Sequence, residues 1–201
     1  LFRSVGIRSF RGQKNITYKQ GDERSFTSNV TVGKFSGKAS EALALRTMLV
    51  ITNEKLRENV RESLGGVYVI QAWNTLDRYP APEYQVKTWM SCDPEKAEML
   101  NTAAIATIDS IKAGLYADKY VDTAKTTMEK TYEESIKSNR YWVSNMSNNV
   151  FKGYAIDQFL DYPQCLAKLN KKELTKAARK YLSFDKNKLS VTMLPMEAAK
   201  E

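Results

Sequence analysis

Histidine is absent from the 201 residues of the chain. Histidine is the usual general base near neutral pH and the commonest zinc ligand in proteins. Its absence excludes a Ser-His-Asp triad, a Cys-His pair and any imidazole-based zinc site within this chain. A catalytic site of any of these kinds would need residues from another domain or another chain.

Cysteine and long apolar runs are also scarce. Cys92 and Cys165 are the two cysteines. Two distant thiols make neither a disulfide framework nor a zinc ribbon, so we expect both to be unpaired. No apolar stretch approaches the roughly 20 residues of a membrane-spanning helix, so no membrane span is expected. The chain opens on Leu1 without a signal peptide, and we therefore expect a piece of a longer protein, with no indication of its compartment.

The overall composition is that of a soluble globular protein. Hydrophobic residues make up 42% of the chain and charged residues 27%. This length and balance allow a sizeable core and do not suggest disorder. Because no internal repeat, linker or low-complexity tract interrupts the sequence, a single domain over residues 1–201 is expected.

The net charge of +8 raises the possibility of a nucleic-acid or anionic-membrane partner. The basic residues, however, are spread along the chain. The densest run, residues 171–180, has helical spacing and is typical of a solvated helix face. No arginine-glycine tract, RNP-type aromatic motif or zinc finger accompanies it, so nucleic-acid binding is the least favoured alternative and no nucleic-acid partner is expected.

Alternating and periodic apolar positions predict the strands and helices. Phe26, Ser28, Val30 and Val32 alternate with polar residues, which indicates a half-buried strand. Strands are expected at 16–18, 26–32, 67–75, 84–91 and 189–193. Helices are expected at 39–63, 94–113, 118–137, 140–153 and 170–182, with the first ended by Gly65 and Gly66. The apolar stripe expected on the first helix is Leu45, Leu49, Thr52, Leu56 and Val60. The stripe expected on the helix at 140–153 is Val143, Met146 and Val150.

The order of these elements predicts an α+β fold. The strands at 67–75 and 84–91 are linked too closely for a crossover, so they should be antiparallel neighbours. Helices grouped between strand pairs favour a two-layer sandwich, with a mostly antiparallel sheet covered on one face by helices. The covering helices are expected to be those at 39–63, 94–113, 118–137 and 140–153. Asp93 is expected to cap the second of them, and Asn170 with Glu173 to form a capping box for the last helix.

The end of the first long helix carries the most specific motif. Residues 56–68 read Leu-Arg-Glu-Asn-Val-Arg-Glu-Ser-Leu-Gly-Gly-Val-Tyr. This segment resembles a signature of the insulinase, pitrilysin and mitochondrial processing peptidase family of zinc metallopeptidases (inverzincins). In the non-catalytic C-terminal domains of that family, a helix ends in Leu-Arg-Glu-x-Leu-Gly-x-x-Tyr and a strand follows. The resemblance extends over about residues 16–195, through the segments 82–86, 92–95 and 116–125.

The resemblance implies a fold and a role. Enzymes of this family are clam-like shells of four similar α+β domains, and the first domain carries the zinc motif His-x-x-Glu-His. An arginine and a tyrosine from the opposite half grip the substrate backbone and help to stabilise the tetrahedral intermediate. At the matching positions here stand Arg61 and Tyr68, with Arg57 as the alternate for the arginine.

The resemblance also implies partners and a cofactor. The partners would be a peptide substrate and the N-terminal catalytic domain or subunit of the same enzyme. Zinc would be bound by a domain absent from this chain. This chain would hold no metal and no catalytic residue of its own, and it would be inactive alone. Its function would be that of a substrate-binding, non-catalytic domain.

Elementary chemistry permits these roles, and two alternatives stand beside them. A tyrosine hydroxyl can donate a hydrogen bond to an oxyanion, and a guanidinium can hold backbone carbonyls with several donors. Alternatively, Arg61 could form an ordinary surface ion pair with Glu58, and Tyr68 could pack on a helix. The chain could also be a non-proteolytic structural or partner subunit of the same fold.

Overall fold

The computed structural model describes residue 6 and residues 9–196. The strands in this part of the chain are β1 (Gln13–Gln20), β2 (Ser25–Lys34), β3 (Val67–Asp77), β4 (Glu83–Cys92) and β5 (Lys188–Pro195). The α-helices are α1 (Ala39–Leu56), α2 (Ala97–Ala113), α3 (Lys119–Ser135), α4 (Asn139–Lys152), α5 (Tyr162–Ala167) and α6 (Lys171–Tyr181). Three short helical segments are the π-helical η1 (Arg57–Glu62) and the 3-10 helices η2 (Pro94–Lys96) and η3 (Gln158–Asp161).

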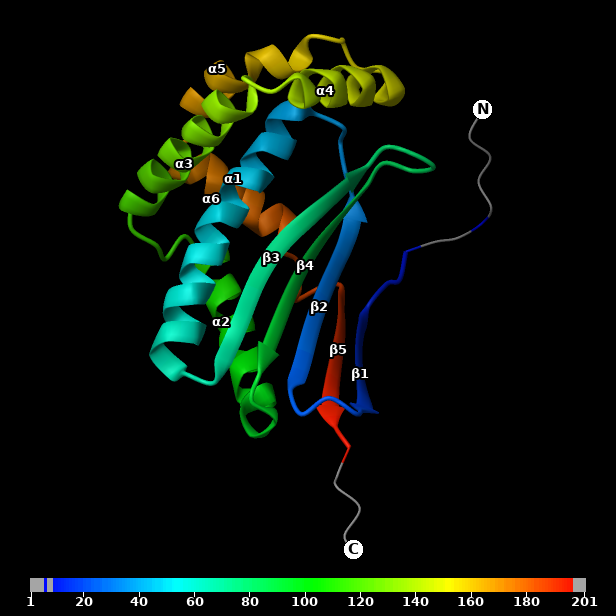
Figure 1. Cartoon of the computed structure of the whole chain (residues 1–201), viewed down its shortest axis with the longest axis vertical. Coiled ribbons are helices and arrows are strands. Elements are labelled where there is room, and N and C mark those ends of the chain that lie inside the picture. Colours follow the sequence, from blue (N-terminus) through cyan, green and yellow to red (C-terminus); the bar gives the residue numbers. More distant parts are fainter. Residues whose placement is uncertain (1–5, 7–8, 197–201) are drawn as a thin grey trace, which may run out of the picture.

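The five strands form one sheet in the order β1-β5-β2-β4-β3. The pairs β5–β2, β2–β4 and β4–β3 are antiparallel, whereas β1 pairs with β5 in parallel. The predicted α+β fold with a mostly antiparallel sheet is therefore confirmed, as is the antiparallel pairing of β3 with β4. Strand β3 lies at one edge of the sheet, so one side of its backbone faces away from every other strand (Figure 1).

Helices α1, α2 and α6 pack together and form the helical layer over one face of the sheet (Figure 1). Helix α1 contacts β3, and α2 contacts β2. The stripe expected on the first helix is confirmed, because all five of its side chains are buried. Burying a stripe of this kind is the main source of stability for a helix in a domain. The core therefore anchors α1 and the following η1 up to Val60, directly before Arg61.

Strand β2 buries its polar side. Thr27, Asn29 and Thr31 face the helical layer and are almost fully buried. Asn29 Nδ2 donates a hydrogen bond of 2.7 Å to Asn101 Oδ1 on α2. Phe26 and Val30 lie half-buried on the opposite face, where the rings of Phe26 and Trp89 stack with centroids 5.8 Å apart. The alternating pattern thus predicts the strand, while the polar contacts of the other face, among them the hydrogen bond from Asn29 to α2, accompany its burial.

The outer helices are placed differently from the expectation. Helix α3 packs on α1 and α5, and α4 lies beyond them at one end of the molecule (Figure 1). The prediction that the helices at 118–137 and 140–153 cover the sheet is therefore wrong. The stripe of α4 is exposed instead of packed, with Val143 64% and Val150 61% accessible. The opposite side of α4, which carries Tyr141 and Asn145, faces the rest of the domain.

The chain ends its helices largely as expected. Gly65 and Gly66 follow the first helix with φ of 64° and 79°, a backbone conformation that glycine adopts without a Cβ clash. At the start of α6, Asn170 Oδ1 accepts a hydrogen bond of 3.1 Å from the backbone N–H of Glu173. Asp93, in contrast, does not cap the following helix with its side chain, because its carboxylate is engaged elsewhere.

Candidate functional site

The candidate site begins where α1 changes its winding. Over Arg57–Glu62 the helix becomes a π-helix, and the N–H of Ser63 donates to the carbonyl of Glu58, five residues earlier. The Ser63 hydroxyl donates to the same carbonyl at 2.7 Å. Short π-helical turns are rare and often lie at functional sites. The wider turn, Gly65-Gly66 and β3 together make a sharp corner that presents residues 57–68.

Arg57 is held by carboxylates on both sides. Its Nη2 lies 2.5 Å from Glu54 Oε1, and its Nε donates to Glu54 Oε2 at 3.3 Å. Its Nη1 pairs with Glu62, a spacing of five residues that the π-turn brings together. With its donors directed at two acids of its own helix, Arg57 is poorly placed to serve another ligand.

Arg61 differs from Arg57 in its surroundings. The sequence allowed an ordinary surface ion pair between Arg61 and Glu58. In the structure, Glu58 instead pairs with Lys55 at 2.9 Å and accepts a hydrogen bond of 2.6 Å from the hydroxyl of Tyr120. The hydrogen bonds from Tyr120 and Lys55 lower the pKa of Glu58. Arg61 is exposed and makes no hydrogen bond or ion pair with any residue that the structure describes. Its donors are available to a ligand.

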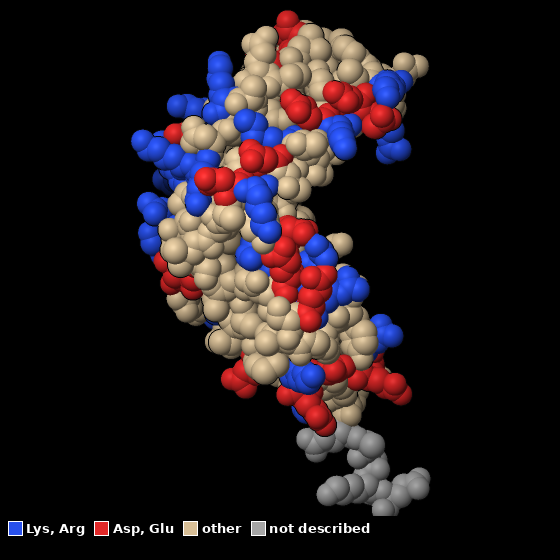
Figure 2. All heavy atoms as spheres, turned by 90° about the vertical axis from the view of Figure 1, so that its left-hand side faces the viewer, with Lys and Arg blue, Asp and Glu red and all other residues tan. Residues whose placement is uncertain are grey.

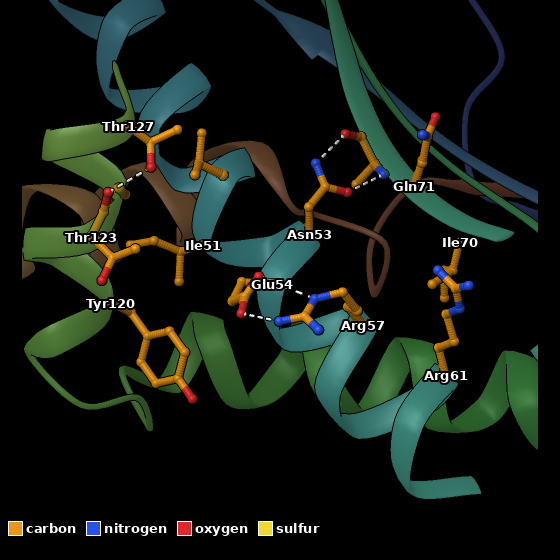
Figure 3. A pocket seen from close by; sticks show the side chains of 13 residues that line it. Ile51, Asn53, Glu54, Arg57, Arg61, Ile70, Gln71, Tyr120, Thr123 and Thr127 are labelled. Carbon is orange, nitrogen blue, oxygen red and sulfur yellow. Dashed lines mark hydrogen bonds and ion pairs between the residues drawn. The ribbon is translucent and has the colours of Figure 1, made fainter. Parts of the chain in front are cut away.

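A cavity of about 530 Å³ lies at the helical side of this corner, where Arg57 and Arg61 line it (Figure 3). Its walls come from α1 with η1, from α3 and from the edge strand β3. Arg61 lies beside Ile70 of β3, whereas Arg57 points toward Glu54. The cavity is lined by Val50, Ile51, Asn53, Glu54, Arg57, Arg61, Ile70, Gln71, Ala72, Tyr120, Thr123, Ala124 and Thr127.

Asn53 occupies part of the exposed edge of β3. Its Nδ2 donates to the carbonyl of Ala72 at 2.9 Å, and its Oδ1 accepts from the N–H of Ala72 at 2.6 Å (Figure 3). A side-chain amide thus stands where the backbone of a further strand would pair. Because N–H and C=O groups alternate along an antiparallel strand, Ile70 directs its backbone groups to the same edge as Ala72. The strand edge nearest to Arg61 therefore faces the cavity.

Tyr68 lies on β3, outside the lining of this cavity. It is the extra residue of a β-bulge, because Val67 pairs with Cys92 and Val69 pairs with Ser91. Its hydroxyl donates a hydrogen bond of 2.7 Å to Asp93 Oδ1, and this hydrogen bond raises the pKa of Tyr68. The guanidinium of Arg24 lies 4.8 Å from the ring centroid. The side chain is 46% exposed, so it remains open to solvent.

The structure thus brings Arg61 and Arg57 into one cavity, whereas Tyr68 lies outside its lining, at the start of β3, with Asp93 and Arg24 as its partners. Sequence reasoning did not anticipate three residues of the site, namely Asn53, Asp93 and Tyr120. Asn53 carried a usable signal, since asparagine is unfavourable inside a helix unless its amide finds a partner. The partners of Asp93 and Tyr120 depend on contacts far along the chain, which no local pattern predicts.

The residues present do not suit a zinc ion. Within the described residues no three His, Cys, Asp or Glu side chains gather as a metal site would require, and the sequence has no histidine. Cys92 is buried, and burial raises the pKa of its thiol to about 11, which disfavours the thiolate that zinc binds. Cys165 is also unpaired. In the same part of the chain, no helix has the length and apolar character that a membrane span requires.

Comparison with known proteins agrees with this fold. No protein-family model matches the sequence. Over 138 residues, 64% of the chain, it is 28% identical to the protein named Probable zinc protease PqqL of Haemophilus influenzae. The periplasmic protease PqqL from Escherichia coli has a similar structure, with a TM-score of 0.81 over 93% of this chain at 17% identity. The peptidase M16 inactive domain from Pseudomonas fluorescens gives a TM-score of 0.74 over 94% of this chain at 14% identity.

These matches define the class of protein. The chain has the fold of the peptidase domains of the M16, or pitrilysin, type, and its resemblance to that family, first stated from residues 56–68, is confirmed. The sequence contains no histidine, so the histidines of the family's zinc motif are not present in this chain. The chain spans 15% of the Haemophilus protein, 21% of the Escherichia protein and 45% of the Pseudomonas chain, so it matches only part of the length of each.

Proposed function

We propose that this domain binds peptide substrate for a zinc metallopeptidase whose catalytic domain is a different one. The domain closes over the peptide and presents Arg61 and Tyr68 to it. Zinc is held by the catalytic domain and by no residue of this chain. The observation that carries the proposal is the difference between the two arginines of η1, since Arg57 is paired with acids and Arg61 is left with all its donors in an open cavity.

The edge of β3 gives this cavity a way to hold a peptide. An extended peptide can add to an exposed strand edge through main-chain hydrogen bonds, which do not depend on the sequence of the peptide. Asn53 blocks that edge at Ala72, so pairing is left to the segment around Ile70, beside Arg61. A guanidinium at this point can hold carbonyl oxygens of the added strand with two or more donors.

Tyr68 takes part through its hydroxyl. A phenol has one proton to donate, and that proton is directed at Asp93 in the free domain. Donation to an oxyanion on the peptide therefore requires Tyr68 to exchange Asp93 for the substrate. Because the side chain is exposed at the bulge of β3, this exchange needs no unfolding of the sheet. Asp93 acts as the resting partner that orients the hydroxyl.

The full-length protein tests the proposal. Peptide hydrolysis is measured with the zinc-loaded full-length protein and with its Arg61→Ala and Tyr68→Phe variants at equal folded concentration. We expect hydrolysis by the parent protein and a marked loss in both variants. A zinc-loaded parent without peptidase activity would favour the non-proteolytic subunit of the same fold. Unchanged hydrolysis in both variants would remove the role of the two side chains.

The distribution of charged side chains on the face shown in Figure 2 does not favour nucleic acid as the ligand. Figure 2 shows acidic and basic side chains interspersed over the face that it presents, together with a hollow below the end that carries α4. Nucleic-acid sites require a basic patch or stripe that is continuous along the backbone of the ligand. On this face, the distribution is that of a mixed protein surface.

A further inference from the structure

A second cavity lies at the other end of the helical layer, away from the corner of residues 57–68. It measures about 660 Å³ and is enclosed by the start of α1, by α3 and α4, and by the segment of η3 and α5. Figure 1 shows that α4 and α5 sit at the end of the molecule where α1 begins. A volume of this size accommodates a small organic ligand or one or two amino-acid residues.

Aromatic rings form one wall of this cavity. Tyr132 and Tyr162 stack with ring centroids 4.8 Å apart and planes within 8°. Tyr141 meets Tyr132 edge to face at 6.2 Å and Phe159 at 5.8 Å. All four side chains line the cavity. Such a wall offers π-faces and ring edges to an apolar or aromatic group.

A single arginine of α1 faces this wall. Arg46 lines the cavity and makes no hydrogen bond or ion pair with any described residue. Its charge acts on the nearby phenols. Burial raises the pKa of Tyr162 to about 12, and the guanidinium of Arg46 opposes that shift. An unpaired guanidinium beside phenolic hydroxyls is suited to an anion, above all to a planar carboxylate that accepts two N–H bonds.

Two of the other cationic side chains that line the cavity are already engaged. Lys152 donates to the carbonyl of Leu76 at 3.3 Å, and Arg78 lies 4.7 Å from the ring centroid of Tyr154. Lys38, Asp77 and Asp161 also contribute to the lining. The two acids would repel a second negative charge on the ligand. A monoanion therefore fits this cavity better than a phosphate with two charges.

We propose that this cavity binds a carboxylate attached to an aromatic or large apolar group, with the carboxylate on Arg46 and the ring against Tyr132, Tyr141 and Phe159. Two sources share this chemistry, namely a free aromatic carboxylic acid and the C-terminal residue of a peptide. The proposal does not depend on the role of Arg61 and Tyr68, because none of the residues that carry it lines the first cavity.

Binding of defined probes to the 201-residue chain tests this proposal. The probes are N-acetylphenylalanine, its C-terminal amide, and a tetrapeptide ending in phenylalanine as the free acid and as the amide. Calorimetry should show that each acid binds about tenfold or more tightly than its amide, since the amide lacks the charge that pairs with the guanidinium. Similar affinity for acid and amide, or no binding of any probe, would overturn the proposal.

Variants locate the site. Arg46→Gln should weaken binding of the acids about tenfold or more and leave the amides unchanged. Arg11→Gln, an exposed arginine outside both cavities, is the matched control and should leave all affinities unchanged. If Arg46→Gln proves poorly folded, chemical-shift changes of Tyr132 and Tyr141 ring protons on adding acid to the unaltered chain decide. Shifts confined to other residues would refute the site.

The two sources are separated by the same titrations. A peptide acid that binds more tightly than N-acetylphenylalanine supports the end of a peptide as the ligand. Equal affinity supports a free aromatic acid, because the added residues then make no contact. Both results support the carboxylate site on Arg46.

Discussion

The hydroxyl of Tyr68 and the carboxylate of Asp93 are joined by a hydrogen bond of 2.7 Å across the ends of β3 and β4. Gly66 makes this approach possible, because a Cβ at Gly66 would lie 2.8 Å from Asp93 Oδ2. The backbone N–H of Asp93 donates to the carbonyl of Gly66 at 2.9 Å. The second glycine of the corner therefore ends the helix and also gives Asp93 the space from which it orients the tyrosine.

Removing the hydroxyl of Tyr68 should affect turnover and not folding. Under the proposed function, Tyr68→Phe in the full-length protein should lower kcat by roughly 10–10³-fold, because one hydrogen-bond donor to an oxyanion is lost. The melting temperature should stay nearly unchanged, because the side chain is exposed and its ring is kept. Steady-state kinetics and a thermal melt measure both quantities. A lower melting temperature with turnover preserved would instead identify Tyr68 as a structural residue.

Asp93→Asn should lower the pKa of Tyr68. In the present structure the carboxylate accepts the phenolic proton and disfavours a second negative charge beside it, so the pKa of Tyr68 lies above its ordinary value. The neutral phenol therefore persists to higher pH in the folded chain, and this hydrogen bond is lost as the pH rises through that pKa. NMR titration of ring-labelled tyrosine should show Tyr68 ionising at lower pH in the variant. An unchanged titration would mean that Asp93 is not its partner in solution.

Arg61→Ala should weaken peptide binding in the full-length enzyme. A guanidinium that holds backbone carbonyls acts on the bound substrate, so KM should rise about 10–100-fold, the range expected for charged hydrogen bonds. Stability should change by less than about 0.5 kcal/mol, because Arg61 has no partner among the described residues.

The matched comparison is Arg57→Ala. Arg57 is paired with Glu54 and Glu62 at the surface, where ion pairs contribute little, so its loss should lower stability only slightly and leave KM unchanged. The reverse pattern, with KM raised only by Arg57→Ala, would assign the gripping role to Arg57. Arg11→Ala serves as the control for the loss of a positive charge elsewhere on the chain.

Local patterns in the sequence were sufficient for most of the helices and strands and for the core face of the first helix. The five-residue stripe of that helix is buried as the 3.6-residue period predicts, with Leu45 and Leu56 fully inaccessible. Glycine and asparagine at helix ends also acted as expected, because their roles depend on the conformation of one or two residues. The motif of residues 56–68 also indicated a helix-to-strand turn, and the structure has that turn at Gly65 and Gly66.

The features that local patterns did not predict depend on contacts between residues far apart in the sequence. The buried face of β2 is polar because Asn29 finds Asn101 on α2, and hydrophobicity alone favours the opposite face. Helix α4 exposes Val143 because its polar side closes the second cavity. Asp93 has the residue type and position of a helix cap, yet Tyr68, 25 residues earlier, takes its carboxylate. In each case the competing partner lies far along the chain.

The purified chain should bind no zinc tightly. It has no histidine, and within the described residues no group of three acidic or thiol side chains forms a metal site. Metal analysis after dialysis should find much less than one equivalent, and the chain alone should not hydrolyse peptides. One equivalent of zinc that survives dialysis would contradict this expectation. Added zinc should also leave the melting temperature unchanged, since a ligand stabilises only the state that binds it.

Glu41 should make the stability of the domain depend on acid pH. It joins α1 to α6, with Lys180 Nζ 2.5 Å from Oε2 and the hydroxyl of Tyr181 donating to the same oxygen. Burial alone raises the pKa of Glu41, but the hydrogen bonds from Lys180, Tyr181 and Ser36 together outweigh it and lower the pKa from 4.5 to about 2. A carboxyl whose pKa is lower in the folded than in the unfolded chain stabilises the fold at pH values above its unfolded pKa. That contribution is lost as the pH falls through its folded pKa.

Glu41→Gln measures this contribution directly. Near neutral pH the variant should be less stable by about 1 kcal/mol, a figure reduced because the pair is partly exposed. As the pH falls from 4.5 to about 2, the difference should shrink, because the wild-type carboxyl becomes protonated. Urea unfolding across this range is the measurement, and Glu134→Gln, which breaks an exposed pair with Lys137, is the control with little effect at any pH. A difference that stays constant with pH would show that Glu41 acts through packing and not through its charge.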